Sequence, residues 1–274
     1  TFGLRAYYRP TQFGRLSIEY HTTNEFRRGG NKFDLEPFET DITEQTKHVI
    51  NSGGLTYDLF WKEYKHKLSF YTSAQHVDRN SYYGAQQDPN AYGKTKDLTF
   101  VGGGMYVGNF DKVLFSPATF TAGLEYSHNN MHDIMAGYNR DLEQKVRIAS
   151  AFFQNEWKMN DFTLLAGFRL DDHNWIENLV FSPRVNLRYN PTKDINIRLS
   201  YSEGFRAPQA FDEDLHIMAV GGEVSLIVLD PNLKEEKSRS VSASVDIYEN
   251  IGSVPTNFLL EGFFTDLSDA FVME

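Results

Sequence analysis

The sequence contains no cysteine, which excludes a disulfide scaffold, a thiolate metal site and a cysteine nucleophile. It has no run of about 18 apolar residues, so no helix that crosses a membrane is expected. Acidic residues outnumber basic ones, 37 to 27, and the net charge is −10. A nucleic-acid partner is therefore not expected, because binding to phosphates requires clustered lysine and arginine.

Sequence motifs of the common enzyme classes are also absent. There is no G-x-S-x-G, no H-E-x-x-H and no phosphate-binding loop. The glycine-rich stretch VGGGMYVG, residues 101–108, lies inside an alternating pattern and not at a strand-to-helix turn. Its glycines are expected to allow curvature or close packing of a sheet. We expect a protein that is not an enzyme and has no bound cofactor or resident metal.

The chain has little helical periodicity, but alternation of apolar and polar residues recurs throughout. In GRLSIEYH, for example, Leu16, Ile18 and Tyr20 share one face of an extended strand. About twelve such runs, most of about 9–12 residues or longer, match the length of strands that cross a bilayer. The low mean hydropathy of −0.47 is compatible with this, because only every second residue of such a strand faces lipid. Aromatic residues near strand ends suit membrane interfaces, for example Trp61, Phe110, Phe115 and Trp157.

The connections between these runs alternate between short and long. The short ones are residues 9–14, 61–67, 158–161, 190–194 and 250–255; the long ones include residues 24–43, 79–95, 129–141 and 203–234. Outer-membrane barrels combine short periplasmic turns with long extracellular loops. The pattern predicts an all-β antiparallel meander that is part of a large transmembrane β-barrel, with the long loops outside the cell.

Two motifs on either side of the longest loop resemble the signature of TonB-dependent outer-membrane receptors. The first is Phe205-Arg206-Ala207-Pro208, and the second is Asp230-Pro231-Asn232-Leu233. Two positions depart from the usual pattern, since Asp230 replaces asparagine and Glu235 stands where proline is common. The resemblance implies a barrel of about 22 strands around a plug domain. Residues 1–274 would then be one partial barrel of about twelve strands, incomplete at both ends and without the plug.

The chemistry of the two motifs favours a structural role first. Pro208 lacks the N–H that strand pairing needs, so it should end a strand at the barrel rim. Arg206 can hold carboxylates or backbone carbonyls with its planar fork of donors. Pro231 should set a turn before the chain re-enters the wall.

The resemblance implies a receptor in the outer membrane of a Gram-negative bacterium that takes up a large scarce ligand. Iron-siderophore, haem and cobalamin are all possible ligands, and the TonB complex would act through the absent plug. His216 lies between the two motifs, where haem-uptake members have a histidine that can ligate haem iron. The acidic residues near it, Asp212, Glu213 and Asp214, could instead bind a divalent ion or form a solvated loop. A second stretch, SHNNMHDIM, offers further histidine and methionine ligands such as Met131 and His132.

Further candidate ligand contacts lie in the other predicted loops. Tyr82, Tyr83 and Tyr92 supply rigid stacking surface with a polar tip. Arg28 belongs to a basic stretch that could attract an anionic chelate or simply aid solubility. Two other functions stay open at this point: a complete passive porin-like channel of about twelve strands, and a soluble β-rich surface binding protein such as a lectin.

Overall fold

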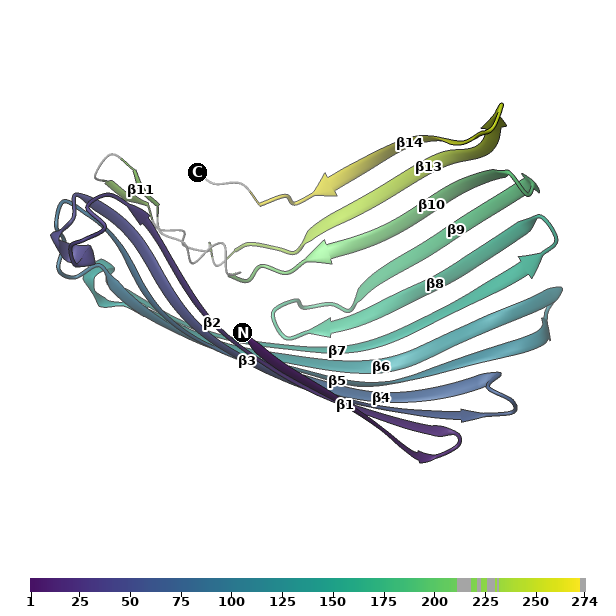
Figure 1. Ribbon diagram of the computed structural model, residues 1–274, viewed down its shortest axis with the longest axis horizontal. Coiled ribbons are helices and arrows are strands. Elements are labelled where there is room, and N and C mark those ends of the chain that lie inside the picture. The colour runs from purple at the N-terminus through teal and green to yellow at the C-terminus, as the bar shows by residue number, and fades with distance from the viewer. Residues whose placement is uncertain (211–217, 221–222, 226–229, 231, 272–274) are drawn as a thin grey trace.

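One curved antiparallel sheet of twelve strands makes up most of the protein (Figure 1). The computed structural model describes residues 1–210, 218–220, 223–225, 230 and 232–271. Each strand pairs with its neighbours in sequence, so the predicted meander is confirmed. The strands are β1 (Phe2–Thr11), β2 (Gly14–Gly30), β3 (Ile42–Trp61), β4 (His66–Ala85), β5 (Tyr92–Val113), β6 (Ser116–Met135), β7 (Arg140–Met159), β8 (Phe162–His173), β9 (Val180–Thr192), β10 (Ile195–Arg206), β13 (Glu236–Ile251) and β14 (Val254–Ser268).

Elements outside this sheet are few and short. β11 (Met218–Val220) and β12 (Glu223–Ser225) pair only with each other, within the connection from β10 to β13. Two 3-10 turns, η1 (Pro37–Glu39) and η2 (Ala136–Tyr138), lie in the connections after β2 and β6. No helix in the described part of the chain is long and apolar enough to cross a membrane.

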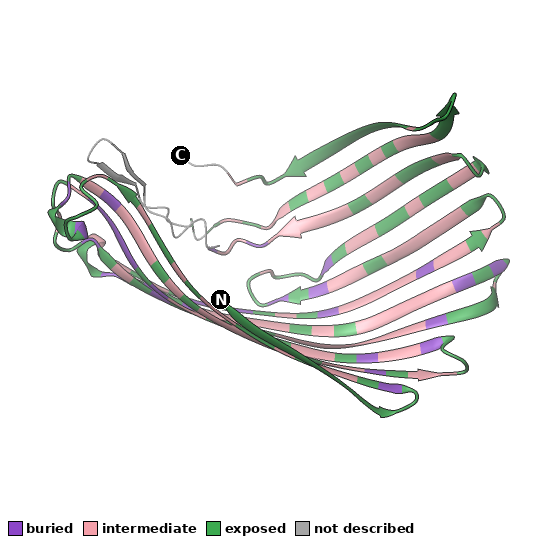
Figure 2. Ribbon diagram, in the orientation of Figure 1, coloured by how far each residue is buried: buried purple, intermediate pink, exposed green. Residues whose placement is uncertain are grey.

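The two faces of the sheet differ in chemistry. Residues 207–210, which follow β10, fold onto the concave face, where the backbone of Ala210 bonds with the side chain of Gln144 on β7. Residues of the opposite parity face outward. Tyr57, Phe70 and Leu124 lie in one cross-strand row on this convex face, and they show that it is apolar. Figure 2 shows this alternation of exposure along the strands. An apolar convex face and a polar concave face are those of a barrel wall in lipid.

Strands β3 to β7 are 20–22 residues long, which corresponds to about 66 Å at 3.3 Å per residue. That is about twice the 30 Å thickness of a bilayer core, so these strands continue beyond the membrane on the long-loop side. The predicted loops at residues 24–43 and 79–95 are therefore too long. β2 continues to Gly30, β4 to Ala85, and β5 begins at Tyr92. Above the membrane both faces are polar, so pairing continues although the apolar alternation ends.

The short turns all lie at one end of the sheet, and aromatic rings gather near them. Trp61 stacks on His66 with ring centroids 5.4 Å apart, Phe115 stacks on Trp157 at 5.7 Å, and Phe162 stacks on Tyr189 at 4.4 Å. These rings lie where the aromatic belt is predicted, and its position at the periplasmic interface stays a prediction.

The alternation of turns and loops predicts which connections are reachable from outside the cell. A peptide tag between Pro89 and Asn90, both exposed at the β4–β5 connection, should bind antibody on intact cells. A tag between Lys193 and Asp194, in the β9–β10 turn, should bind only after the outer membrane is opened. Flow cytometry before and after permeabilisation measures this, and the reverse pattern would contradict the orientation.

Candidate binding surface on the concave wall

A row of polar residues crosses five adjacent strands on the concave face. Its members are paired directly across β4 to β8: Tyr71, Gly103, Glu125, Ser150 and Asp171. Cross-strand partners share a face, so the register alone brings these side chains together. The residues are distant in sequence, and the sequence analysis did not identify them as a site.

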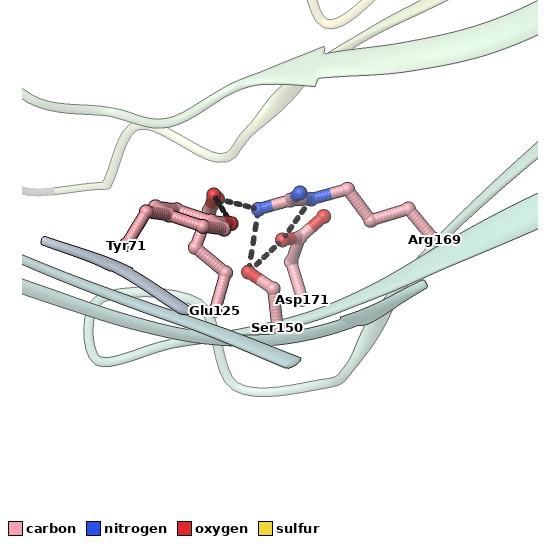
Figure 3. Close-up of polar contacts among 5 residues, drawn as sticks. All are labelled: Tyr71, Glu125, Ser150, Arg169 and Asp171. Carbon is pink, nitrogen blue, oxygen red and sulfur yellow. Dashed lines mark hydrogen bonds and ion pairs between the residues drawn. The ribbon is translucent and has the colours of Figure 1, made fainter. Parts of the chain in front are cut away.

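Arg169, two residues before Asp171 on β8, joins the members of this row (Figure 3). Its Nε donates to Asp171 Oδ1 at 2.8 Å, and its terminal NH2 donates to Glu125 Oε1 at 2.9 Å. Tyr71 donates its hydroxyl to the other oxygen of Glu125 at 2.7 Å, and Ser150 donates to Asp171 at 2.6 Å. The result is a continuous network of charged hydrogen bonds along the wall, referred to below as the wall network.

Gly103 is the member of the row that makes this network possible. A Cβ atom at this position would lie 2.6 Å from the Tyr71 hydroxyl and 2.7 Å from the backbone carbonyl of Leu124. The ring of Tyr71 can cross β5 and reach Glu125 on β6 only because no side chain stands between them. The expectation of close packing for this glycine-rich stretch is confirmed at Gly103.

The wall network presents two carboxylates and one guanidinium to the concave side, a net charge of −1. The side chain of Asp171 is only 4 % exposed, whereas those of Glu125 and Arg169 are 24 % and 38 % exposed. The buried side chain of Asp171 is held in place by the wall. Those of Glu125 and Arg169 can form hydrogen bonds with a molecule in the barrel interior.

A cavity of about 410 Å³ lies nearer the long-loop end of the same face. Polar side chains from β2 to β6 line it together with the apolar Ile50, Val77 and Met131, and Gln209 and Ala210 close one side. Beside it a buried ion group joins four strands, β4 to β7, with Arg140 Nε 2.9 Å from Asp133 and Arg79 donating to Thr95 at 3.0 Å. The cavity is therefore a pocket of mixed polar and apolar lining that lies beside buried ion pairs.

The first family motif comes directly before Gln209 and Ala210, the two residues that close one side of this cavity. β10 ends at Arg206, as predicted from Pro208, and Ala207 is buried. Gln144 then holds the chain, since its side-chain nitrogen donates to the Ala210 carbonyl at 3.1 Å and its oxygen accepts from Ala210 N–H at 2.9 Å. The guanidinium of Arg206 lies 5.3 Å from the centre of the Phe271 ring. A ligand contact by Arg206 stays a prediction.

The second motif forms a turn before β13. Asp230 Oδ1 accepts from the Asn232 N–H at 2.7 Å, and the Leu233 N–H donates to the Asp230 carbonyl at 3.2 Å. An aspartate carboxylate makes this turn as asparagine does, which explains why the departure at position 230 is tolerated. Pro231 lies outside the described residues.

The structure corrects the expected positions of Tyr82 and Tyr83, which lie in strand β4 and not in a loop. They are only 1 % and 4 % exposed. Tyr82 donates its hydroxyl to the Asp88 carbonyl at 2.8 Å, and Tyr83 packs against Met135 and Tyr138. Burial raises the pKa of the Tyr138 phenol, which stays protonated and donates to the Tyr83 carbonyl at 2.6 Å.

Arg28 and Tyr92 are also strand residues, and they lie on the convex parity. One convex row joins Arg28, Gln45, Tyr82 and Tyr92. Arg28 donates to the Leu35 carbonyl at 2.7 Å, so it holds its own connection in place. That Arg28 and the three tyrosines contact a ligand stays a prediction, and the convex positions of Arg28, Tyr82 and Tyr92 do not favour a contact inside the barrel.

The haem-iron prediction cannot be placed on the structure, because His216, Asp212, Glu213 and Asp214 lie outside the described residues. It stays a prediction. In the second candidate stretch, Met131 is buried on the concave face. His132 lies on the convex face, where its Nε2 is 2.8 Å from Asp141 Oδ1. Neighbours of opposite parity cannot ligate one metal together. The described residues contain no cluster of three or more histidine, aspartate or glutamate side chains suited to a metal.

Comparison with known proteins agrees with this architecture. The family model described as "TonB dependent receptor-like, beta-barrel" matches residues 1–273. No curated protein matches the chain at a significant level.

Solved structures of siderophore receptors have the same fold as the chain at low sequence identity. The siderophore receptor PirA from Pseudomonas aeruginosa is 16 % identical, with a TM-score of 0.73 over 97 % of this chain and 45 % of that one. A mutant ferric enterobactin receptor, PfeA, from the same organism in complex with enterobactin is 16 % identical, with a TM-score of 0.69 over 96 % and 42 %. The alcaligin outer-membrane receptor FauA from Bordetella pertussis is 11 % identical, with a TM-score of 0.67 over 97 % and 42 %. The chain thus spans less than half the length of these receptors.

Proposed function

The chain belongs to the family of TonB-dependent receptor β-barrels of the Gram-negative outer membrane, and we propose that it forms part of a receptor that takes up an iron-siderophore chelate. The whole receptor would contain a longer barrel and a plug, through which the TonB complex supplies energy. The observation that carries the proposal is the family match over residues 1–273. The fold shared with PirA, PfeA and FauA supports a siderophore as the ligand.

The open edges of the sheet favour a large receptor over a complete porin of twelve strands. Within the described residues, β1 pairs only with β2, and β14 pairs only with β13. A closed barrel leaves no such edges. The concave face has polar networks suited to a hydrated interior or a plug, and these do not distinguish a siderophore from haem or cobalamin.

Deletion of the gene in an iron-starved host provides the test. We expect uptake of ⁵⁵Fe-labelled siderophores to fall at least about tenfold for the cognate ligand, and to be restored by the full-length gene. A protonophore should abolish the restored uptake, because transport energised through the TonB complex needs the proton gradient. Passive diffusion would not need it. Unchanged uptake of every siderophore, or transport that persists with the protonophore, would contradict the proposal.

Haem and cobalamin are alternative outcomes of the same experiment. Uptake of haem but not of siderophores would favour the haem reading. Replacing His216 by alanine should then lower haem affinity and change the haem absorption spectrum, because an axial nitrogen is lost. A receptor with unchanged haem binding after this substitution would exclude His216 as the ligand.

A further inference from the structure

Three arginines lie close together on the concave face of β9 and β10. Asp171 of the wall network pairs with Val180 on β9, so the even-numbered residues of β9 share its face. Arg184 and Arg188 are two of these residues, and Arg188 pairs directly with Arg198 on β10. All three arginines are exposed. They are referred to below as the arginine cluster.

The members of the arginine cluster have no acidic partner within the part of the chain that the structure describes. Arg188 donates to the Thr163 hydroxyl at 3.3 Å. Arg198 donates to the side-chain oxygen of Asn196 at 2.9 Å. Like charges directly opposite each other on neighbouring strands destabilise a sheet. The pairing of Arg188 with Arg198 therefore carries a cost that a bound anion would remove.

A pocket of about 250 Å³ is lined by all three arginines. Asn186 and Ser200, which pair with each other across β9 and β10, also line it. The lining includes the acidic residue Glu156, whose carboxylate is already 3.2 Å from Lys158 Nζ. Three arginines and one glutamate give the lining a net charge of +2, although the chain as a whole has a net charge of −10. The pocket is therefore suited to an anion.

The size of the pocket indicates side chains as its occupants and not a whole small-molecule ligand. Pockets that enclose such ligands have volumes of about 300–1,000 Å³, and this one has about 250 Å³. Arg188 and Arg198 can share one carboxylate, since directly paired strand residues have Cα atoms about 5 Å apart. Arg184 lies four residues along β9 from Arg188, about 13 Å away. The occupant would thus carry two carboxylates about 13 Å apart.

The position of the arginine cluster indicates where the occupant lies. Arg188 is four residues from Thr192, the end of β9, and Arg198 is three residues from Ile195, the start of β10. The cluster is therefore close to a short turn, on the face that lines the barrel interior. A domain that resides in the interior would compensate the paired arginines at all times. A transported chelate would compensate them only while it passes.

We infer that the arginine cluster binds two carboxylates of an acidic segment of the plug domain. Arg188 and Arg198 hold one carboxylate between them, and Arg184 holds the other. Guanidinium groups bind carboxylates through pairs of parallel hydrogen bonds, which fix the direction of the contact as well as its strength. Asn186 and Ser200 lie between the two carboxylates and contact the backbone of the segment. The inference rests on the proposed receptor function, because a passive channel needs no plug.

The first test identifies the occupant in the full-length receptor in detergent. Arg184→Lys, Arg188→Lys and Arg198→Lys are made singly, so that each keeps the charge and introduces an amine. A carbodiimide then joins this amine to a carboxylate in direct contact with it, and mass spectrometry of the digested protein identifies the linked peptides. Lys62 and Lys193, which are exposed at the short turns, are internal controls. Heat-modifiable mobility on gels confirms that the variants are folded.

We expect the introduced amines to be linked to aspartate or glutamate residues of the plug, and the amines of Lys62 and Lys193 not to be linked to it. Position 188 and position 198 should share the same plug residue, and position 184 should be linked to a different one. Links to carboxylates of the barrel alone, or no links from any of the three positions, would overturn the inference.

The second test measures how firmly the arginine cluster holds the plug. A protease site between the plug and the barrel allows release of the cleaved plug in mild urea, which size-exclusion chromatography follows. One triple variant carries Arg184→Gln, Arg188→Gln and Arg198→Gln. The matched control carries Lys62→Gln, Lys112→Gln and Lys193→Gln, which removes three exposed cations at or beside the short turns of the same end. The barrel stays folded, because the members of the cluster donate only to neutral groups within the wall.

We expect the cleaved plug to leave the arginine variant at least about tenfold faster than the unmodified receptor, and to leave the control at a rate within about twofold of it. Equal release from the two triple variants would overturn the inference. Normal retention of the plug together with slower siderophore transport, at unchanged siderophore binding, would assign the cluster to the transported chelate instead. Gene deletion tests the transport function separately, so failure of the inference leaves that function untouched.

Discussion

Replacing Gly103 by alanine should lower the free energy of unfolding of the full-length receptor by about 3 kcal/mol. The added Cβ would lie 2.7 Å from the backbone carbonyl of Leu124, which cannot move without disturbing the β5–β6 pairing. It would also lie 2.6 Å from the Tyr71 hydroxyl, so Tyr71 would lose its contact with Glu125. Urea unfolding in lipid vesicles, followed by tryptophan fluorescence, measures the change.

Gly104→Ala is the matched control, because it lies on the same strand but faces the convex side. A Cβ there would meet the Phe70 ring at 3.4 Å, an ordinary packing distance. Both substitutions restrict the unfolded chain equally, so their difference reports the folded state alone. Tyr71→Phe separates the two causes, since it removes the hydrogen bond and leaves the strand backbone unchanged. If Gly103→Ala and Gly104→Ala have the same stability, close approach at Gly103 is not the reason for the glycine.

Replacing Arg169 by methionine should lower the free energy of unfolding by about 2–3 kcal/mol in the same urea measurement. Removal of one partner of a fully buried ion pair costs about 3–5 kcal/mol, because the remaining charge is left uncompensated. Arg169 is 38 % exposed, so water screens part of the loss and the expected value is smaller. The carboxylates of Glu125 and Asp171 would then lie on neighbouring parts of the wall without the cation between them.

A double-mutant cycle with Glu125→Gln should give a coupling energy of about 1–2 kcal/mol between Glu125 and Arg169. Arg188→Met is a suitable control, because Arg188 is an exposed concave residue whose hydrogen bond goes to the Thr163 hydroxyl at 3.3 Å. It should change the free energy of unfolding by less than about 0.5 kcal/mol. A coupling energy near zero would show that the wall network adds no stability beyond its separate hydrogen bonds.

Several features of the fold follow from local sequence patterns. In the part of each strand that faces lipid, residues such as Leu16, Ile18 and Tyr20 must alternate with polar ones, since the two faces meet different solvents. Tight turns between such strands can also be recognised in the sequence, because the alternation stops and restarts within a few residues. The end of β10 at Arg206 is equally local, because Pro208 cannot donate a ladder hydrogen bond.

The prediction of loops failed where the alternation ends but the strand does not. Above the membrane both faces of β2 and β4 are polar, so residues up to Gly30 and Ala85 looked like loop. Once the strands are known to continue, the period of two places Arg28 and Tyr82 on the convex side. The error in their expected positions came from strand length and not from the chemistry assigned to each side chain.

The sequence by itself determined the all-β meander, its turns, its family motifs and the place of the wall in the outer membrane, because each depends on residues close together in the chain. Only the tertiary structure brought Tyr71, Glu125, Ser150 and Asp171 into one row. That row depends on the register between five strands, and register is the cumulative result of every turn and pairing between residues 71 and 171. Shifting any one strand by a single residue would turn its member to the opposite face, so no local pattern could have predicted the wall network.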